Sequence, residues 1–211
     1  MDEPVVVQAD GDTPWSDFDI PDGNIPVSVS RLHTEAESFT LFVRFPAGWK
    51  RGSTGYYESG EDFLILDGAL TMTGQTYGKG DWVHVPAGAV RAETSSESGA
   101  LSLARFGGPA RWIQSSEPPM SIPLHRDLAA TAALTPLTSP LGPEDAWLLR
   151  DEGGISSWLL EPPPPGTKCE FACEFLDLAR RVWCWVPVGA EIPYLEGLCF
   201  CRMFEGTGGA E

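Results

Sequence analysis

The residues of this chain that could do chemistry gather between Gly48 and Arg91. Glu61 is a candidate general acid or base, because a carboxyl group can exchange a proton with a bound substrate. Arg91 is a candidate anion holder, since a guanidinium group binds carboxylates, enolates and phenolates through charge-assisted hydrogen bonds. Tyr56 is a candidate hydrogen-bond donor to a substrate carbonyl, and Thr54 adds a second hydroxyl group. Together these groups predict acid–base chemistry on a small organic molecule.

The same residues also allow a structural interpretation. Glu61 and Arg91 could pair with each other and replace a lost metal site, which would leave no free carboxylate for a substrate. The Tyr56 ring could simply fill a cavity. The sequence leaves both interpretations open.

Three further residues are candidates for the same site. Trp82 and His84 lie on one predicted strand and share a face of it, because side chains alternate along a strand. If that face lines a pocket, the pocket gains a stacking ring and a titratable group. If it faces outward, both side chains meet the second half of the chain or a dimer partner. Trp49 is a third candidate for contact with the substrate.

The spacing of the turn residues around these groups resembles the two motifs of the cupin superfamily. The first motif is Gly, five residues, His-x-His, four residues, Glu, six residues and Gly. Here it runs from Gly48 to Gly68 with Glu61 in place. The second motif is Gly, five residues, Pro-x-Gly, two residues and His, and Gly80–Gly88 matches all of it but the His.

The resemblance implies a barrel with a pocket, but three of the four usual metal ligands are replaced. Thr54 and Tyr56 stand at the two His positions of the first motif, and Arg91 stands at the His of the second. A first-row metal needs about three His, Cys or carboxylate ligands, and Glu61 supplies one. Arg91 stays protonated and would repel a cation. We therefore expect a pocket without a metal or other cofactor, or a barrel filled by its own side chains.

Composition and charge narrow the range of partners. The chain has 211 residues, a formal net charge of −16 and only 14 Lys and Arg residues, which argues against nucleic acid as a partner. No apolar run is long enough to span a membrane, and the acidic start lacks the apolar core of a signal peptide. A cytoplasmic protein is the expectation. The five cysteines, an odd number, favour reduced, buried thiols over disulfides or a zinc site.

The pattern of short apolar runs predicts an all-β fold. Runs such as SFTLFVRF, EDFLILDG and VWCWVP alternate with Gly- and Pro-rich turns, and long helical periodicity is absent. Three segments of the first half have an echo in the second, which indicates a duplicated domain. The echoes pair 38–48 with 155–166, 81–88 with 182–189, and the two closing strands with each other.

In the family that this chain resembles, such a duplication makes a bicupin, in which two jelly-roll (double-stranded β-helix) barrels follow each other. We expect residues 1–114 to form the barrel with the pocket. Residues 115–211 would form a linker and a degenerate second barrel, in which Ile192 replaces Arg91. Exposed sheet edges need covering, so we also expect a homodimer.

Two functions from different classes fit these features. The first is a metal-independent enzyme that performs cyclisation, isomerisation, elimination or dehydration on an aromatic or polyketide-like substrate. The second is a non-catalytic cupin that binds a small molecule or regulates through it. A roomy apolar cavity with an unpaired Glu61 would favour the enzyme, and a collapsed cavity with a Glu61–Arg91 ion pair would favour the binding or structural interpretation.

Overall fold

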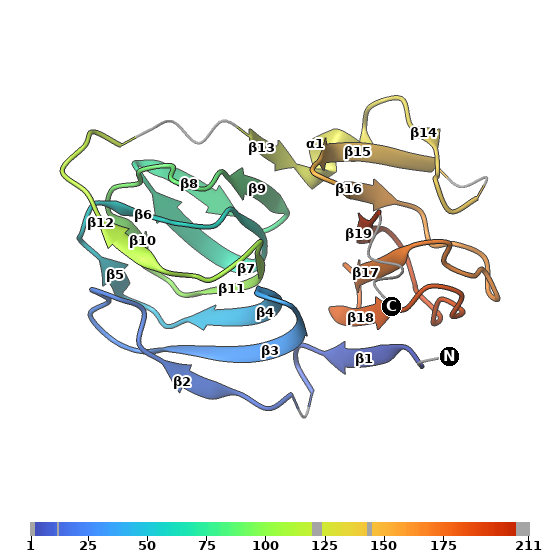
Figure 1. Ribbon diagram of the computed structural model, residues 1–211, viewed down its shortest axis with the longest axis horizontal. Helices are drawn as coiled ribbons and strands as arrows, with labels where there is room; N and C mark the ends of the chain where they lie inside the picture. Colours follow the sequence, from blue (N-terminus) through green and yellow to red (C-terminus); the bar gives the residue numbers. More distant parts are fainter. Residues whose placement is uncertain (1–2, 12, 120–123, 143–144, 206–211) are drawn as a thin grey trace. The chain divides into compact units, whose positions relative to one another are not determined.

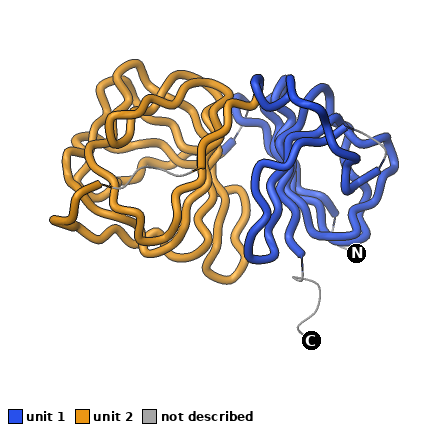
Figure 2. The backbone as a smooth tube through the Cα atoms, turned by 90° about the horizontal axis from the view of Figure 1, so that it is seen from above, with its two compact units in different colours: residues 1–13, 129–211 blue, residues 14–128 orange. Residues whose placement is uncertain are grey.

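Antiparallel β-strands make up nearly all of the regular secondary structure in this computed structural model, which describes residues 3–11, 13–119, 124–142 and 145–205 (Figure 1). The chain divides into two compact units, coloured separately in Figure 2. One unit holds residues 14–128, and the other holds residues 1–13 with residues 129–211. The expected all-β jelly-roll class is confirmed.

The unit of residues 14–128 is built on a ten-stranded sheet with the order β13-β9-β7-β11-β4-β3-β2. Strands β8 and β10 also pair with β7, and β5 pairs with β10. A separate pair, β12 and β6, lies outside this sheet. The strands of this unit are β2 (Ser16–Phe18), β3 (Val27–Glu35), β4 (Ser38–Phe45), β5 (Trp49–Arg51), β6 (Gly55–Tyr57), β7 (Glu61–Met72), β8 (Gln75–Gly78), β9 (Asp81–Val85), β10 (Thr94–Ser96), β11 (Ala100–Phe106), β12 (Trp112–Gln114) and β13 (Leu124–Asp127).

The long strand β7 connects the two layers of this unit. Its first residues, Glu61 to Leu64, pair with β9, whereas Ala69 to Met72 pair with β8. The register with β11 slips in between, at Leu101 and Ser102, which is a β-bulge. Such a bulge bends a strand, so one strand can serve both layers. Phe63 and Ile65 alternate into the apolar core.

Gly68, the closing residue of the first motif, makes this bend possible. Its φ angle is +68°, a conformation that glycine adopts without strain. A Cβ atom at this position would lie 2.0 Å from the carbonyl oxygen of Gly99. The motif glycine is therefore required by a close backbone approach.

The second unit contains one seven-stranded sheet with the order β1-β18-β17-β19-β16-β15-β14. Its strands are β1 (Val5–Gln8), β14 (Leu137–Thr138), β15 (Asp145–Glu152), β16 (Ile155–Leu160), β17 (Ala172–Asp177), β18 (Val182–Val186) and β19 (Cys199–Phe204). The short helix α1 (Leu128–Ala132) begins at the last residue of the other unit and continues into this one. Read from β9 and from β18, the two sheets have the same order, because β9-β7-β11-β4-β3-β2 corresponds to β18-β17-β19-β16-β15-β14. This agrees with the internal echo in the sequence. That the second unit is a reduced cupin barrel stays a prediction.

The turn that carries Arg91 in the unit of residues 14–128 has a counterpart in the second unit, where the position of Arg91 is uncharged. The amide of Gly88 donates a hydrogen bond to the carbonyl of Tyr57 (3.0 Å), and the amide of Gly189 donates one to Cys169 (2.8 Å). Cys169 thus takes the place of Tyr57. Ile192 lies buried in the apolar core beside it, in agreement with the sequence comparison.

The five cysteines are free thiols, and all are buried. Burial raises the pKa of Cys184 to about 12, and the pKa values of the other four are also raised. Among the residues that the structure describes, no group of three or more His, Cys, Asp or Glu residues could hold a metal ion. The cysteines pack as small apolar side chains in the core of the second unit.

The units divide the chain differently from the boundary that the sequence suggested after residue 114. The first strand, β1, pairs with β18 and so belongs with the C-terminal residues. Part of the expected linker completes the first unit instead, because β13 pairs with β9. The linker prediction also covered residues 120–123, which lie outside the described residues. Within the described part of the chain, no helix is long and apolar enough to span a membrane.

We predict that Gly68→Ala destabilises the protein by about 3 kcal/mol, because it adds both backbone strain and a steric overlap with Gly99. Urea unfolding measures this change. Gly78→Ala is the matched control on β8, since a Cβ atom there meets nothing within 4 Å. Equal stability of the two variants would contradict the assigned role of Gly68.

Candidate functional site

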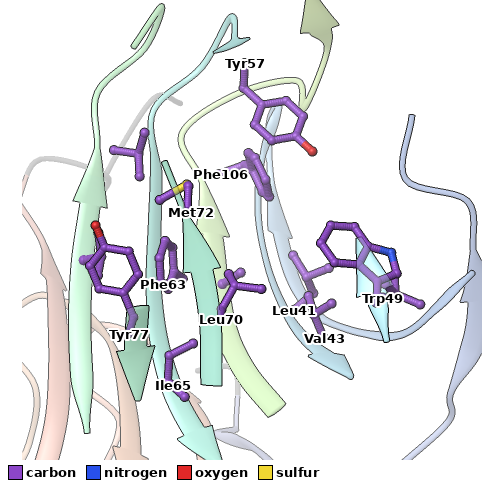
Figure 3. Close-up of a cluster of buried hydrophobic side chains, with 14 of the residues drawn as sticks. Leu41, Val43, Trp49, Tyr57, Phe63, Ile65, Leu70, Met72, Tyr77 and Phe106 are labelled. Carbon is purple, nitrogen blue, oxygen red and sulfur yellow. The ribbon is translucent and has the colours of Figure 1, made fainter. Parts of the chain in front are cut away.

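The unit of residues 14–128 holds a cavity of about 210 Å³ among its core side chains. Figure 3 shows how these side chains face one another, with Phe63, Leu70 and Met72 on one side and Leu41, Val43 and Trp49 on the other. Strand alternation creates this wall: Phe39, Leu41, Val43 and Phe45 are every second residue of β4, and all four line the cavity. Most of the lining is therefore aliphatic or aromatic.

One end of the cavity is polar and holds the two motif residues that the sequence singled out. The guanidinium Nη1 of Arg91 donates a hydrogen bond to Glu61 Oε2 at 2.6 Å. The Arg91 side chain is buried, with 5% of its surface exposed, and the Glu61 side chain is mostly buried, with 13% exposed. Arg91 is placed by backbone bonds with Gly55, whose carbonyl accepts from the Arg91 amide at 2.7 Å. Glu61 and Arg91 form an ion pair at the edge of an apolar cavity.

Arg51 is a third charged group at this end, and the sequence analysis missed it. Its Nη1 donates a hydrogen bond to the hydroxyl of Tyr57 (3.2 Å), and its guanidinium lies 3.6 Å from the centre of the Trp112 ring. Only 2% of Arg51 is exposed. Burial lowers the pKa of Arg51, and the positive charge of Arg91 lowers it further. Alternation along the strand could have identified Arg51, since Trp49 was already a candidate and the two residues share the buried face of β5.

Tyr57, rather than Tyr56, faces the cavity, which corrects the expectation from motif spacing. Strand β6 pairs with β12, and this pairing sets the Tyr57 ring edge-on against Trp112, with 5.2 Å between ring centres. The Arg91 guanidinium lies 4.9 Å from the centre of the Tyr57 ring. Tyr56 alternates to the other face of the strand and is not among the residues that line the cavity.

Thr54, which stands at the other His position of the first motif, also differs from expectation. Thr54 is half-buried just before β6 and does not line the cavity. Its carbonyl accepts a hydrogen bond from the Ser115 amide at 3.0 Å. Gly55 next to it has no room for a side chain, because a Cβ atom would lie 2.3 Å from the carbonyl of Ile113. The contact between β6 and β12 thus decides which residues reach the cavity.

Trp82 and His84 do not belong to the cavity. Val83 and Val85 of β9 lie in the apolar core of the unit of residues 14–128. Because side chains alternate along a strand, Trp82 and His84 point to the opposite face of β9. Both are buried there, and His84 Nδ1 lies 2.6 Å from Asp62 Oδ1. Trp49 does line the cavity, as expected, and packs edge-on against Phe45 with ring centres 4.8 Å apart.

The residues at this end do not fit a metal ion. Of the four positions that carry ligands in the family motifs, Thr54 and Tyr56 are turned away from the cavity. The remaining carboxylate, Glu61, is bonded by the Arg91 guanidinium. A permanent cation therefore already sits against the one suitable ligand, and a metal ion beside it would be repelled.

Comparison of the fold finds similar solved structures at low sequence identity. A Nostoc punctiforme PCC 73102 protein with a provisional dioxygenase assignment matches with a TM-score of 0.79 and 13% identity, over 99% of this chain and 85% of that one. Two variants of Bacillus subtilis oxalate decarboxylase OxdC match with TM-scores of 0.58 and 0.57 at 12% and 13% identity. Each match covers 100% of this chain and 79% of the OxdC chain. At such identities the likeness shows the fold alone.

The sequence itself points to one family. No curated protein matches it significantly. Residues 3–109, which are half of the chain and include both motifs, match the profile of the ChrR cupin-like domain. With the jelly-roll strands and motif turns described above, this match shows that the chain belongs to the ChrR cupin-like family of the cupin superfamily.

Proposed function

We propose that the unit of residues 14–128 binds a small, largely apolar organic molecule, and that the chain is a small-molecule-binding or regulatory cupin. The observation that supports this most is the cavity of about 210 Å³, which has an aliphatic and aromatic wall beside a closed Glu61–Arg91 ion pair. Apolar cavities of about 150 Å³ already accept benzene. A one- or two-ring molecule is therefore the size of ligand that we propose.

The Glu61–Arg91 ion pair is the reason why we prefer a binding function to a catalytic one. A general acid or base must exchange a proton with the substrate, and an unpaired Glu61 would have favoured that role. Instead, one oxygen of Glu61 already accepts a hydrogen bond from Arg91. The geometry combines a roomy cavity with a paired carboxylate, which fits a binding pocket better than an acid–base site.

An enzyme of the cyclase, isomerase, lyase or dehydratase type is the second candidate. One observation favours it: the Glu61 carboxylate and Tyr57 both line the cavity, so both border the space that a substrate would fill. In that case Glu61 would act as the base, with Arg91 holding the anion that forms. Mass spectrometry of molecules that co-purify with the protein would identify either a ligand or a substrate.

A homodimer is also part of the proposal. The outermost strands of the seven-stranded sheet carry exposed apolar side chains: Val5 and Val6 on β1 and Leu137 on β14. Unpaired sheet edges of this kind are commonly covered by another chain.

We predict that the protein binds 2-naphthamide, a neutral two-ring probe, and that Ala104→Phe reduces this affinity by about tenfold or more. Ala104 lines the cavity and is 3% exposed, so a phenyl ring there takes up the space of the probe. Calorimetry measures both affinities. Ala87→Phe, at an exposed turn, is the control and should bind as the wild type does. Failure of the wild-type protein to bind both this probe and its carboxylate analogue, 2-naphthoate, would overturn the proposed function.

We predict that Glu61→Gln destabilises the fold by about 3 kcal/mol, because it leaves two buried guanidinium groups without a carboxylate beside them. Thermal or urea unfolding provides the measurement. Glu58→Gln is the matched control, since Glu58 forms an exposed pair with Arg111 at 3.3 Å and should change stability little. A Glu61→Gln variant of unchanged stability would instead favour the catalytic candidate.

We predict that protein purified without chelators contains no stoichiometric transition metal at this site. The reason is the donor set, in which a guanidinium group contacts the only carboxylate. Elemental analysis tests this directly. About one iron, zinc, manganese or nickel ion per chain, lost in Glu61→Ala, would contradict the prediction.

A further inference from the structure

We propose that the ligand of this cavity carries a carboxylate on its apolar body, and that Arg51 and Arg91 bind this group together. The inference rests on the proposed function, because it assigns the chemical class of the molecule that fills the same cavity. Arg51 is the new element, since it lies within the span of the first family motif but at none of the positions that the motif specifies.

The first step is the charge at the polar end of the cavity. Arg51 and Arg91 are buried, with 2% and 4% of their surface exposed, and both line the cavity. The buried lining contains one carboxylate, Glu61, and Arg91 binds it. Two positive charges therefore face one negative charge in a place with little water. An unbalanced buried charge is costly, and an anionic ligand would balance it.

Neighbouring carboxylates outside this group do not remove the imbalance. Asp19 and Arg31 also line the cavity, but both are exposed. Asp22 feels the charge of Arg51, yet it lies exposed and accepts a hydrogen bond from Gln114 at 2.8 Å. Water screens these groups, so they compensate buried Arg51 only weakly.

The second step is the excess of hydrogen-bond donors. A guanidinium group has five N–H donors and no acceptor. Arg51 donates to the neutral hydroxyl of Tyr57, and the Nε atoms of both Arg51 and Arg91 are buried without a hydrogen-bond partner. Donors thus outnumber acceptors at this end of the cavity. A carboxylate brings two acceptor oxygens and a negative charge, which is the complement of this set.

The third step is preorganisation. The Trp112 ring stacks on Arg51, and the Tyr57 ring faces both guanidinium groups, at 5.5 Å from Arg51 and 4.9 Å from Arg91. These cation–π contacts fix the two cations before a ligand arrives. Binding then loses little conformational freedom in the protein. Most of the remaining wall is aliphatic or aromatic, so the other part of the ligand should be largely apolar as well.

The experiment compares 2-naphthoate with 2-naphthamide, which have the same ring system and nearly the same shape but differ in charge. We expect the wild-type protein to bind naphthoate about 10- to 100-fold more tightly, as hydrogen bonds between charged groups allow. In Arg51→Met, which keeps a long apolar side chain without the charge, this preference should fall to about threefold or less. The preference is a ratio of two affinities in the same variant, so a change that weakens both probes equally does not alter it.

Arg111→Met is the matched control, since Arg111 is an exposed arginine whose side chain is 69% accessible and which does not line the cavity. It should keep the full preference for naphthoate. Equal binding of the two probes to the wild-type protein would overturn this inference while the proposed function stands. Absence of binding by both probes would overturn the two together. The wild-type comparison decides the inference even if Arg51→Met fails to fold.

Discussion

The hydrogen bond between Arg91 and Glu61 is the interaction on which the rest of this site depends. A cupin barrel brings the turn after β9 and the start of β7 to one point, where family motifs place metal ligands. Here the two side chains at that point carry opposite charges and bind each other at 2.6 Å. The positive charge of the site is therefore carried by a side chain, Arg91, instead of a bound metal ion. Because a guanidinium group cannot lose its proton in a protein, the charge persists whether or not a ligand is bound.

This substitution explains why the surrounding aromatic residues matter. A buried arginine needs partners for its flat faces as well as for its edges, and Tyr57 and Trp112 supply them. The equivalent turn of the second unit shows the opposite solution. There Cys169 takes the place of Tyr57 and Ile192 lies in an apolar core, so no charge requires compensation. One strand order thus supports a charged cavity in one unit and a core of thiols and aliphatic side chains in the other.

Much of the fold could be predicted from the sequence, because it depends on local patterns. Alternating apolar runs gave the strands, and the glycines of the two motifs marked turns and close approaches such as that of Gly68 to Gly99. The echo between the halves anticipated the common strand order. The motif spacing also brought Glu61 and Arg91 together. Pairings between distant segments were missed, since nothing in the local sequence tells that β1 pairs with β18 or that β13 completes the first unit.

The sequence by itself determined the family, the all-β class and the loss of the usual metal ligands, because these depend on residue type and spacing. The tertiary structure decided that Glu61 and Arg91 bind each other. Only the tertiary structure decided which side chains reach the cavity. The pairing of β6 with β12 turned Tyr57 inward and Tyr56 outward, and the core packing of Val83 and Val85 sent His84 to the opposite face. Arg51 likewise lines the cavity because it lies on the buried face of β5. A strand offers two faces with equal spacing, and which of them is buried is set by the strands that pack against it.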